Sequence, residues 1–386
     1  MIKKLLFIGL TLFSSHAWSY PNFIGFGYNA CLTCHYNPYG NGPLTDYGRA
    51  LSANAISDRL IHSDSKSEEE IATNSGFLYS KPKNQWLRPS IDYRGLYLKS
   101  NYQTDTEDSK IIHMDANLNL VFRLGPKENK DKFIAVGTVG YAPAPLSNQD
   151  STEPKYRSRE HYLGYRMNDK WGVYGGLMDK IFGLRIPDHI TYSRIAPAVS
   201  QNDQTHGVLL HYTKPVLDFG VQAYVGNMAQ DANLRQKGIA TQAEYSVTDN
   251  TRIGGSLFNS KSIFLKTYGM AFHSRSRFGK GSSIMAEVGQ VNKSAVSGSS
   301  DIDSRYWLIQ NHIKASRGLY IINTIEYFKA NIKKKEDKSI RFGPGLQYFP
   351  GQGLELRTDL YNTRVFSEES VSDDTWDITG QLHLWF

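Results

Sequence analysis

Apolar and polar residues alternate along most of the chain after residue 86, and residues 112–124 show the pattern best. The even positions there are Ile112, Met114, Ala116, Leu118, Leu120, Phe122 and Leu124, whereas the odd positions are His113, Asp115, Asn117, Asn119, Val121 and Arg123. A β-strand points successive side chains to opposite faces, so one face of this segment would be apolar and the other mostly polar. An apolar face of this length suits lipid, and the polar face suits a water-filled lumen.

The last segment, residues 373–386, repeats the alternation and ends on an aromatic residue. Its apolar positions are Trp376, Ile378, Leu382, Leu384 and Phe386, and its polar positions are Thr375, Asp377, Thr379, Gln381 and His383. Chain ends usually fray unless they are held in a sheet. A terminal aromatic on the lipid-facing side resembles the C-terminal signature of bacterial outer-membrane barrels.

Sixteen segments with this character are predicted as strands. They are residues 87–103, 109–124, 131–143, 157–167, 170–178, 204–213, 217–227, 236–248, 251–260, 264–277, 281–292, 304–316, 318–330, 339–349, 353–365 and 373–386. Tight turns such as Lys214-Pro215 alternate with longer polar connections, as in outer-membrane barrels with short periplasmic turns. We therefore predict an all-β fold, a 16-stranded antiparallel transmembrane barrel. A soluble sandwich or propeller is the alternative, but its strands are shorter and its turns do not alternate in length.

The longest predicted external loop runs from Asp179 to Asp203 and contains several apolar residues. A loop of this length without its own secondary structure is usually functional. One interpretation folds it into the lumen as a constriction lined by Lys180, Arg185, His189 and Arg194, which would favour anions or a haem propionate. The other interpretation packs it over the mouth of the barrel.

The first nineteen residues have the features of a secretory signal. Lys3 and Lys4 precede an apolar run, and Ala17-Trp18-Ser19 supplies a small-x-small step for cleavage. An N-terminal membrane anchor is the alternative, but the apolar run is short for a span.

Both cysteines of the chain occur in the stretch ACLTCHYNPYG, as Cys31 and Cys34, with His35 directly after them. Three interpretations compete: a disulfide redox pair, half of a zinc site, or a covalent haem anchor. A zinc site would need further ligands at suitable spacing, and a thioredoxin-like pair would need a βαβ context. The pattern favours one haem c, with Cys31 and Cys34 as thioether attachments and His35 as the proximal iron ligand. An exposed redox dithiol is the main rival.

The second axial ligand is not fixed by the motif. No methionine lies between His35 and Met114, so the usual alternative to histidine is missing from this segment. His62 is the candidate that we favour from the sequence, because it is the other histidine of the N-terminal region. His113, His189 and His383, expected in the lumen, or an open coordination site remain alternatives.

The predicted organisation is a signal peptide at 1–19, a c-type haem-binding segment at 20–63, a linker at 64–85 and the barrel at 86–386. Removing the signal would lower the formal charge from +7 to about +5, without a cluster of basic residues typical of nucleic-acid binding. About 65 residues before the barrel with one short helix, expected near 46–60, are few for a free-standing core. We expect docking against the barrel to complete it.

A signal, one CxxCH motif and a porin-like barrel ending in Phe386 together resemble the fused monohaem cytochrome–porin family of outer-membrane electron-transfer proteins. Separately, the stretch GLMDKIFGLRIPDHITYSR is similar to the third-loop region of phosphate-selective-type porins, whose fold has sixteen strands. The first resemblance implies single-electron transfer at the outer membrane between an external donor or acceptor, for example ferrous iron, and a periplasmic carrier such as a soluble cytochrome.

Other functions stay open. A second hypothesis is a solute porin, which could be anion-selective, with the haem segment as plug or redox gate. A haem enzyme such as a peroxidase would need an open coordination site and distal acid–base groups, and no such motif occurs in the sequence. We therefore expect an electron-transfer protein more than a substrate-converting enzyme. The expected partners are outer-membrane lipid and a periplasmic electron carrier, with a homo-trimer as in many porins, and no nucleic acid.

Overall fold

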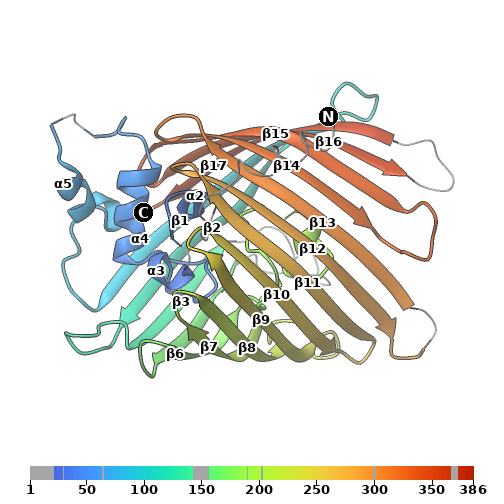
Figure 1. Cartoon of the computed structure of the whole chain (residues 1–386), viewed down its shortest axis with the longest axis horizontal. Helices are drawn as coiled ribbons and strands as arrows, with labels where there is room; N and C mark the ends of the chain where they lie inside the picture. The colour runs from blue at the N-terminus through green and yellow to red at the C-terminus, as the bar shows by residue number, and fades with distance from the viewer. Residues whose placement is uncertain are drawn as a thin grey trace, which may run out of the picture.

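The computed structural model describes residues 21–28, 30–62, 65–141, 156–188, 190–200, 203–298, 301–366 and 373–386. The predicted signal at 1–19 lies outside these residues. The dominant element is one closed antiparallel sheet (Figure 1). Its strands are β1 (Leu87–Ser100), β2 (Asp108–Arg123), β3 (Phe133–Tyr141), β4 (Tyr156–Arg157), β5 (His161–Arg166), β6 (Trp171–Met178), β7 (Thr205–Thr213), β8 (Leu217–Gly226), β9 (Lys237–Thr248), β10 (Thr251–Lys261), β11 (Leu265–Phe278), β12 (Ser282–Ala295), β13 (Asp301–Lys314), β14 (Leu319–Lys329), β15 (Lys338–Gly351), β16 (Leu354–Phe366) and β17 (Asp373–Trp385).

The barrel closes where the first strand pairs with the last. Tyr93 of β1 lies opposite Leu384 of β17, and backbone hydrogen bonds join Ile91 to Phe386 in both directions. Strands β4 and β5 both pair with β3 and are separated by three residues, so they act as one interrupted strand. The sheet therefore has sixteen spanning strands, and the prediction of an all-β, 16-stranded antiparallel barrel is confirmed.

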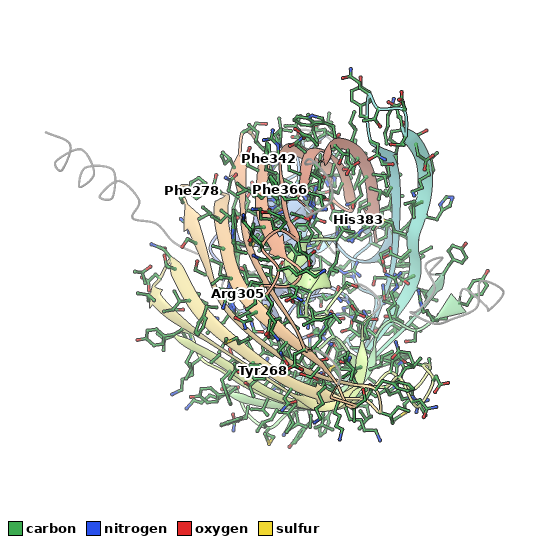
Figure 2. All side chains as sticks on the ribbon, turned by 90° about the vertical axis from the view of Figure 1, so that its right-hand side faces the viewer. Tyr268, Phe278, Arg305, Phe342, Phe366 and His383 are labelled. Atoms are coloured by element: carbon green, nitrogen blue, oxygen red, sulfur yellow. The ribbon has the colours of Figure 1, made fainter. Side chains whose placement is uncertain are left out.

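The alternation of side chains follows the predicted faces over most of β2. Leu118 and Phe122 are exposed on the outer face, whereas Asn117 and Asn119 are buried on the inner face. Figure 2 shows side chains on both sides of the wall, with His383 inside the ring of strands. The prediction was wrong near the start of the strand, where Met114 is buried. A bulge opposite Arg94 and Gly95 shifts the register there and reverses the alternation.

Residues 21–62 form short helices inside the barrel and directly outside one of its two ends (Figure 1). They are not a separate globular domain. These are α2 (Pro21–Gly25), α3 (Cys31–Cys34), α4 (Asp46–Leu51) and the π-helix η1 (Ser52–Ile56). The helix expected near 46–60 thus ends at Ile56. The predicted linker contains α5 (Glu68–Thr73) and the 3-10 turn η2 (Phe77–Tyr79). In the described part of the chain, no helix has the length and apolar character needed to cross a membrane.

Helix α2 lies against the inner wall at the tight turn between β11 and β12. The Ser283 hydroxyl donates to the Pro21 carbonyl, and Asn22 Nδ2 donates to Gln347 Oε1 of β15 at 3.1 Å. Phe23 packs with Ile56 and with Phe349 of the wall. The end of the barrel that carries tight turns is therefore the end that the N-terminal segment fills.

The loop after β6 folds into the lumen, as one of the two interpretations of residues 179–203 proposed. Its apolar side chains Ile181, Phe182, Leu184 and Ile186 are buried. Their backbone is held by the inner wall: Gln222 accepts from the Ile181 N–H and Ser256 accepts from the Gly183 N–H, each at 3.0 Å. A short helix, α6 (Tyr192–Ile195), continues the loop inside the barrel. We call residues 179–203 the inner loop.

The N-terminal segment and the inner loop meet inside the barrel. Ile24 of α2 shares a buried cluster with Leu184 and Ile186 of the inner loop. Asn41 Nδ2 donates to Asp179 Oδ2 at 3.1 Å, which adds a polar contact between the same two segments. The lumen is therefore occupied from both directions.

Candidate functional site

The two cysteines lie on the single turn of helix α3, and the chain then makes a tight loop. Gly40, Asn41 and Gly42 all have positive φ values, of 79°, 72° and 64°. Glycine adopts this conformation readily, and asparagine is among the residues that tolerate it best. This is why the sequence reads Gly-Asn-Gly at this point. Asn37 Oδ1 caps the loop by accepting from the Tyr39 N–H at 3.0 Å.

The loop returns the chain to the cysteines. The Thr45 N–H donates to the Cys34 carbonyl at 2.9 Å, and Thr45 Oγ1 then caps helix α4 by accepting from the Gly48 N–H. A Cβ at position 48 would lie 2.4 Å from the Cys34 carbonyl oxygen, so only glycine allows this approach. Helix α4 is therefore packed directly on the CxxCH helix.

Neither cysteine is in a disulfide, and they differ in exposure. The Cys34 side chain is 1% exposed and packs with Phe23, Ile56 and Tyr320. Burial raises the pKa of the Cys34 thiol to about 12, so the thiolate needed for disulfide exchange is scarce at neutral pH. This environment disfavours the exposed redox dithiol.

His35 is buried at the inner end of the motif. Burial lowers the pKa of its imidazole to about 4, which keeps the ring neutral at pH 7, the form that binds metal ions. Its Nδ1 atom is buried and has no hydrogen-bond partner. The ring also lies against the backbone of Asn41 and Gly42, so the Gly-Asn-Gly loop holds the imidazole in place.

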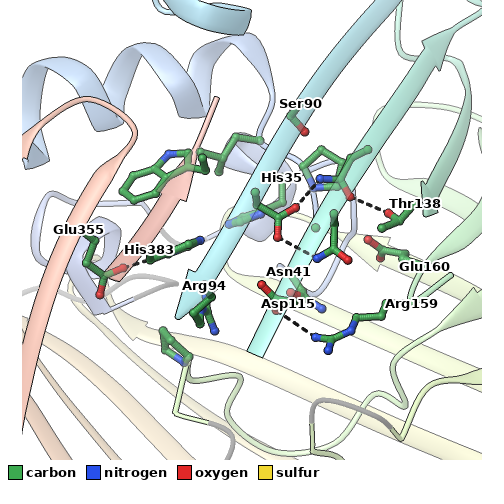
Figure 3. A pocket seen from close by; sticks show the side chains of 18 of the residues that line it. His35, Asn41, Ser90, Arg94, Asp115, Thr138, Arg159, Glu160, Glu355 and His383 are labelled. Carbon is green, nitrogen blue, oxygen red and sulfur yellow. Dashed lines mark hydrogen bonds and ion pairs between the residues drawn. The ribbon is translucent and has the colours of Figure 1, made fainter. Parts of the chain in front are cut away.

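The His35 ring lines a cavity of about 260 Å³ between the N-terminal segment, the inner loop and the barrel wall (Figure 3). This volume is just below the roughly 300 to 1,000 Å³ typical of small-molecule and cofactor sites. Its apolar lining residues are Phe23, Leu44, Ile56, Ile91, Ile186, Phe349, Trp385 and Phe386, and its basic ones are Arg49, Arg94, Arg159, Arg185 and Arg194. The same lining includes Asp92, Asp115, Glu160, Asp179 and Glu355, and two of these carboxylates pair with Arg159 and Arg185. The cavity therefore joins an apolar surface to a mixed set of charged groups.

A second histidine, His383 of β17, lines the same cavity. Its Nδ1 lies 3.0 Å from Oε2 of Glu355, the residue directly opposite on β16. Glu355 is 2% exposed and its other oxygen accepts from Gln347 Nε2 at 2.6 Å. In Figure 3 the His35 and His383 rings both reach the cavity, one from the N-terminal segment and one from the barrel wall.

The other wall of the cavity is polar and internally paired. Asp92 accepts from Asn117 at 2.9 Å and from Asn119 at 2.6 Å, and Arg159 Nη1 lies 3.0 Å from Asp115 Oδ2. Glu160 accepts from Asn37 Nδ2 at 2.5 Å, which ties the CxxCH loop to the wall. These groups hold the cavity in shape on the side away from His383.

Two of the other histidines that the sequence offers as distal iron ligands, His62 and His113, do not line this cavity. His62 lies past helix η1, with Lys66, Arg59 and Arg317 as its charged neighbours, and does not line the cavity. His113 points away from the lumen, where its Nδ1 lies 2.8 Å from the Tyr93 hydroxyl. His189 lies outside the described residues.

The predicted constriction residues of the inner loop are engaged within the loop itself. Arg185 pairs with Asp179, and Arg194 donates to the carbonyls of Val199 and Ile186 at 2.8 and 2.7 Å. Lys180 is buried, with its ammonium 5.5 Å from the centre of the Phe258 ring. Arg185 and Arg194 line the cavity, whereas Lys180 does not.

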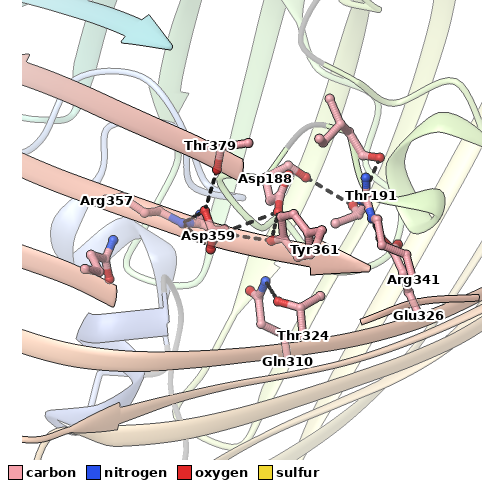
Figure 4. A network of polar contacts seen from close by, with 12 residues as sticks. Asp188, Thr191, Gln310, Thr324, Glu326, Arg341, Arg357, Asp359, Tyr361 and Thr379 are labelled. Atoms are coloured by element: carbon pink, nitrogen blue, oxygen red, sulfur yellow. Dashed lines mark hydrogen bonds and ion pairs between the residues drawn. The ribbon is translucent and has the colours of Figure 1, made fainter. Parts of the chain in front are cut away.

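A polar network fixes the inner loop to strands β14–β16 (Figure 4). Asp188 Oδ2 accepts from the Tyr361 hydroxyl at 3.0 Å and lies 3.5 Å from Arg357. Glu326 accepts from the Tyr192 N–H at 2.7 Å, and Arg341 donates to the Ile190 carbonyl at 3.0 Å. Residues 188–192 of the loop are therefore attached to β14–β16, whereas Ile181 and Gly183 are attached to β8 and β10.

Neither a protein-family model nor a curated protein sequence matches this chain. Solved structures do match in fold. The OmpT outer-membrane protein of Vibrio cholerae aligns with a TM-score of 0.59 at 10% identity, covering 78% of this chain and 97% of that one. The anion-selective porin of Comamonas acidovorans gives 0.58 at 8% identity, with 78% and 99% covered. The channel DcaP of Acinetobacter baumannii gives 0.57 at 12% identity, with 78% and 97% covered. The chain therefore has the fold of bacterial outer-membrane porins.

Proposed function

We propose that this protein is a barrel of the bacterial outer membrane whose lumen is closed by its own N-terminal segment, and that this segment carries one covalent haem c. Cys31 and Cys34 would form the thioethers, and His35 would be the proximal iron ligand. The protein would then carry single electrons between an external donor or acceptor, for example ferrous iron, and a periplasmic carrier. The haem supplies the one-electron chemistry, and the chain supplies its position.

The residues around the cavity fit this group. His35 is neutral and has an unpartnered Nδ1, and the apolar lining would cover a porphyrin. Arg94, Arg185 and Arg194 line the cavity, and a haem propionate could pair with a guanidinium of this set. Cys31 lines a smaller neighbouring cavity of about 50 Å³ that shares His35 and Arg185 with the larger one. Cys34 lines neither cavity and is packed against Phe23 and Tyr320.

The single observation that carries the proposal is that the CxxCH segment lies within the barrel. An apolar bilayer core of about 30 Å separates the two sides of a membrane, so a redox centre inside the lumen shortens the gap that electrons must cross. The same position would block the diffusion of solutes through the lumen. Ile24 and Asn41, which contact the inner loop, contribute to this closure.

The comparisons favour a second function, a solute porin whose N-terminal segment is a plug or redox gate. The similar structures include an anion-selective porin and a channel, and none is described as a cytochrome. The arginines around the cavity would suit anions if the segment left the lumen. One of the similar structures is the trimer form of OmpT, which makes a homo-trimer a reasonable expectation for this chain.

The deciding experiment measures single-channel conductance of the purified full chain in a planar bilayer. Haem staining and visible spectra are recorded on the same sample, produced in cells with a c-type haem maturation system. Covalent haem with no steady conductance supports the electron-transfer proposal. Covalent haem with an open, anion-preferring channel supports the gated porin instead.

Two variants serve as controls for this experiment. The Cys31→Ser, Cys34→Ser double variant should lose the haem stain and retain the heat-dependent gel migration of a folded barrel. A variant that lacks residues 21–62 should conduct, because the wall does not depend on that segment for its strand pairing. Absence of covalent haem from the unmodified chain contradicts the electron-transfer proposal and the redox gate.

A further inference from the structure

Inside the lumen, His383 and Glu355 form a hydrogen-bonded pair that lies outside the CxxCH motif and has no role in the function proposed above. The two residues face each other across β16 and β17, and their side chains meet at 3.0 Å. Both belong to the barrel wall, and both line the cavity that contains His35. The pair thus reaches the cavity from the barrel wall, whereas His35 reaches it from the N-terminal segment (Figure 3).

The pairing fixes which nitrogen of His383 can bind a metal ion. A carboxylate only accepts hydrogen bonds, so the 3.0 Å contact with Glu355 favours the tautomer of His383 that carries its proton on Nδ1. The lone pair of the neutral ring is then on Nε2. This is the arrangement found around metal-binding histidines, where a carboxylate sets the tautomer and raises the basicity of the ligand.

A chain of hydrogen bonds continues from Glu355 to the N-terminal segment. Gln347 Nε2 donates to Glu355 Oε1 at 2.6 Å, and Gln347 Oε1 accepts from Asn22 Nδ2 at 3.1 Å. Asn22 and Gln347 are both fully buried. Docking of helix α2 therefore orients the Gln347 amide through Asn22. The Gln347 amide positions the Glu355 carboxylate, and the carboxylate positions the His383 ring.

From this geometry we infer that His383 is the distal axial ligand of the haem, bound through Nε2, with Glu355 and Gln347 as positioning residues. The inference rests on the proposed function, since it requires a haem on Cys31 and Cys34. It assigns the iron two histidines, one from the N-terminal segment and one from the last strand. His62, which the sequence favoured, would then be a surface residue.

The test compares spectra of the haem-loaded full chain with those of variants, not activity. The unmodified protein should show a low-spin, six-coordinate spectrum, and near-infrared magnetic circular dichroism should identify two histidine ligands. His383→Gly should keep the haem stain but become high-spin and bind carbon monoxide readily. Added imidazole should restore the low-spin spectrum, since it can occupy the space of the missing ring.

Matched controls separate this role from general damage. His113→Gly, on the outer face, and His62→Gly should both remain low-spin. Glu355→Gln should stay low-spin with a higher midpoint potential, because a neutral amide makes His383 a weaker donor than a carboxylate does. This variant and the dichroism of the unmodified protein test the inference even if His383→Gly fails to fold.

The outcomes distinguish a failure of the ligand inference from a failure of the proposed function. A low-spin His383→Gly protein, or a high-spin unmodified protein with covalent haem, overturns the ligand inference and leaves the proposed function standing. High-spin conversion of His62→Gly instead would assign the ligand to His62 and also overturn the inference. An unmodified chain without covalent haem overturns the proposed function itself.

Discussion

The Gly281 N–H donates a hydrogen bond to the Gly25 carbonyl over 2.6 Å, which joins helix α2 to the turn between β11 and β12. A Cβ added at Gly25 would lie 2.2 Å from the carbonyl carbon of Gly281. Because the opposing atoms are backbone, no side chain can move aside to relieve the contact. The close approach of these two glycines is therefore a condition for docking the N-terminal segment in the lumen.

We predict that Gly25→Ala weakens this docking by roughly 1–3 kcal/mol, the usual effect of overpacking. Cys34 reports the change, because it is 1% exposed in the docked state. In haem-free protein with Cys31→Ser, a maleimide reagent should label Cys34 faster when Gly25 is replaced. Gly137→Ala is the matched control, since a Cβ there has no neighbour within 4 Å. Equal labelling rates for the two variants would contradict the prediction.

A second prediction concerns Asn37, whose amide donates to the buried carboxylate of Glu160 at 2.5 Å. Asn37→Ala would leave this carboxylate without its amide donor, with an expected loss of about 1–3 kcal/mol in docking free energy. The same labelling of Cys34 measures the loss. In a Glu160→Gln background the effect of Asn37→Ala should shrink, because a neutral amide is less costly to leave unsatisfied. An undiminished effect would show that Asn37 acts through other contacts.

A third prediction concerns the salt dependence of helix α4. Arg88 forms a two-pronged pair with Asp46, with distances of 2.6 and 2.9 Å, and Arg123 also reaches Asp46 at 3.0 Å. The Asp46 side chain is 42% exposed, so salt should screen the pairs. Labelling of Cys34 should therefore accelerate with sodium chloride in the parent protein. Asp46→Asn should be faster at low salt, by up to about tenfold, and much less sensitive to added salt.

A fourth prediction concerns the anchor of the inner loop. Tyr361→Phe removes the hydroxyl that donates to Asp188 at 3.0 Å, which should weaken the anchor by about 0.5–1.5 kcal/mol. In the variant lacking residues 21–62, this change should produce larger and noisier single-channel currents as the loop leaves the lumen more often. Tyr268→Phe on the outer surface should leave the currents unchanged. Identical traces for both tyrosine variants would assign the loop position to its apolar contacts alone.

The strand boundaries could be predicted closely because every strand of a barrel alternates lipid-facing and lumen-facing residues in the same way. Strand β16, for example, begins at Leu354 against an expected 353, and β10 begins at Thr251 as expected. The bulge near Gly95 could not be predicted, since a period of two carries no sign of a register shift set by the partner strand. The interruption between β4 and β5 could not be predicted from the alternation of the sequence either.

The candidate site could be predicted only in part. Cys31, Cys34 and His35 are adjacent in the sequence, so their spacing alone indicates the chemistry. His383 is brought to the same cavity by closure of the barrel, which no local spacing reveals. A usable signal existed: His383 and Glu355 both fall on polar, lumen-facing positions of consecutive strands, so pairing β16 with β17 would have placed them together. The sequence favours His62 because it is the other histidine between the predicted signal and the barrel.

The position of His383 on the strand that closes the barrel has a consequence for biogenesis. Strand β17 pairs with β1 only when the cylinder is complete, so the histidine side of the cavity comes into existence at the last step of assembly. The CxxCH segment must already lie between the strands at that moment, or it must enter later through a lumen that the inner loop partly fills. Chains that close around an empty interior would lack the contacts of Asn22 and Asn37 and should be the ones that cellular proteases remove first.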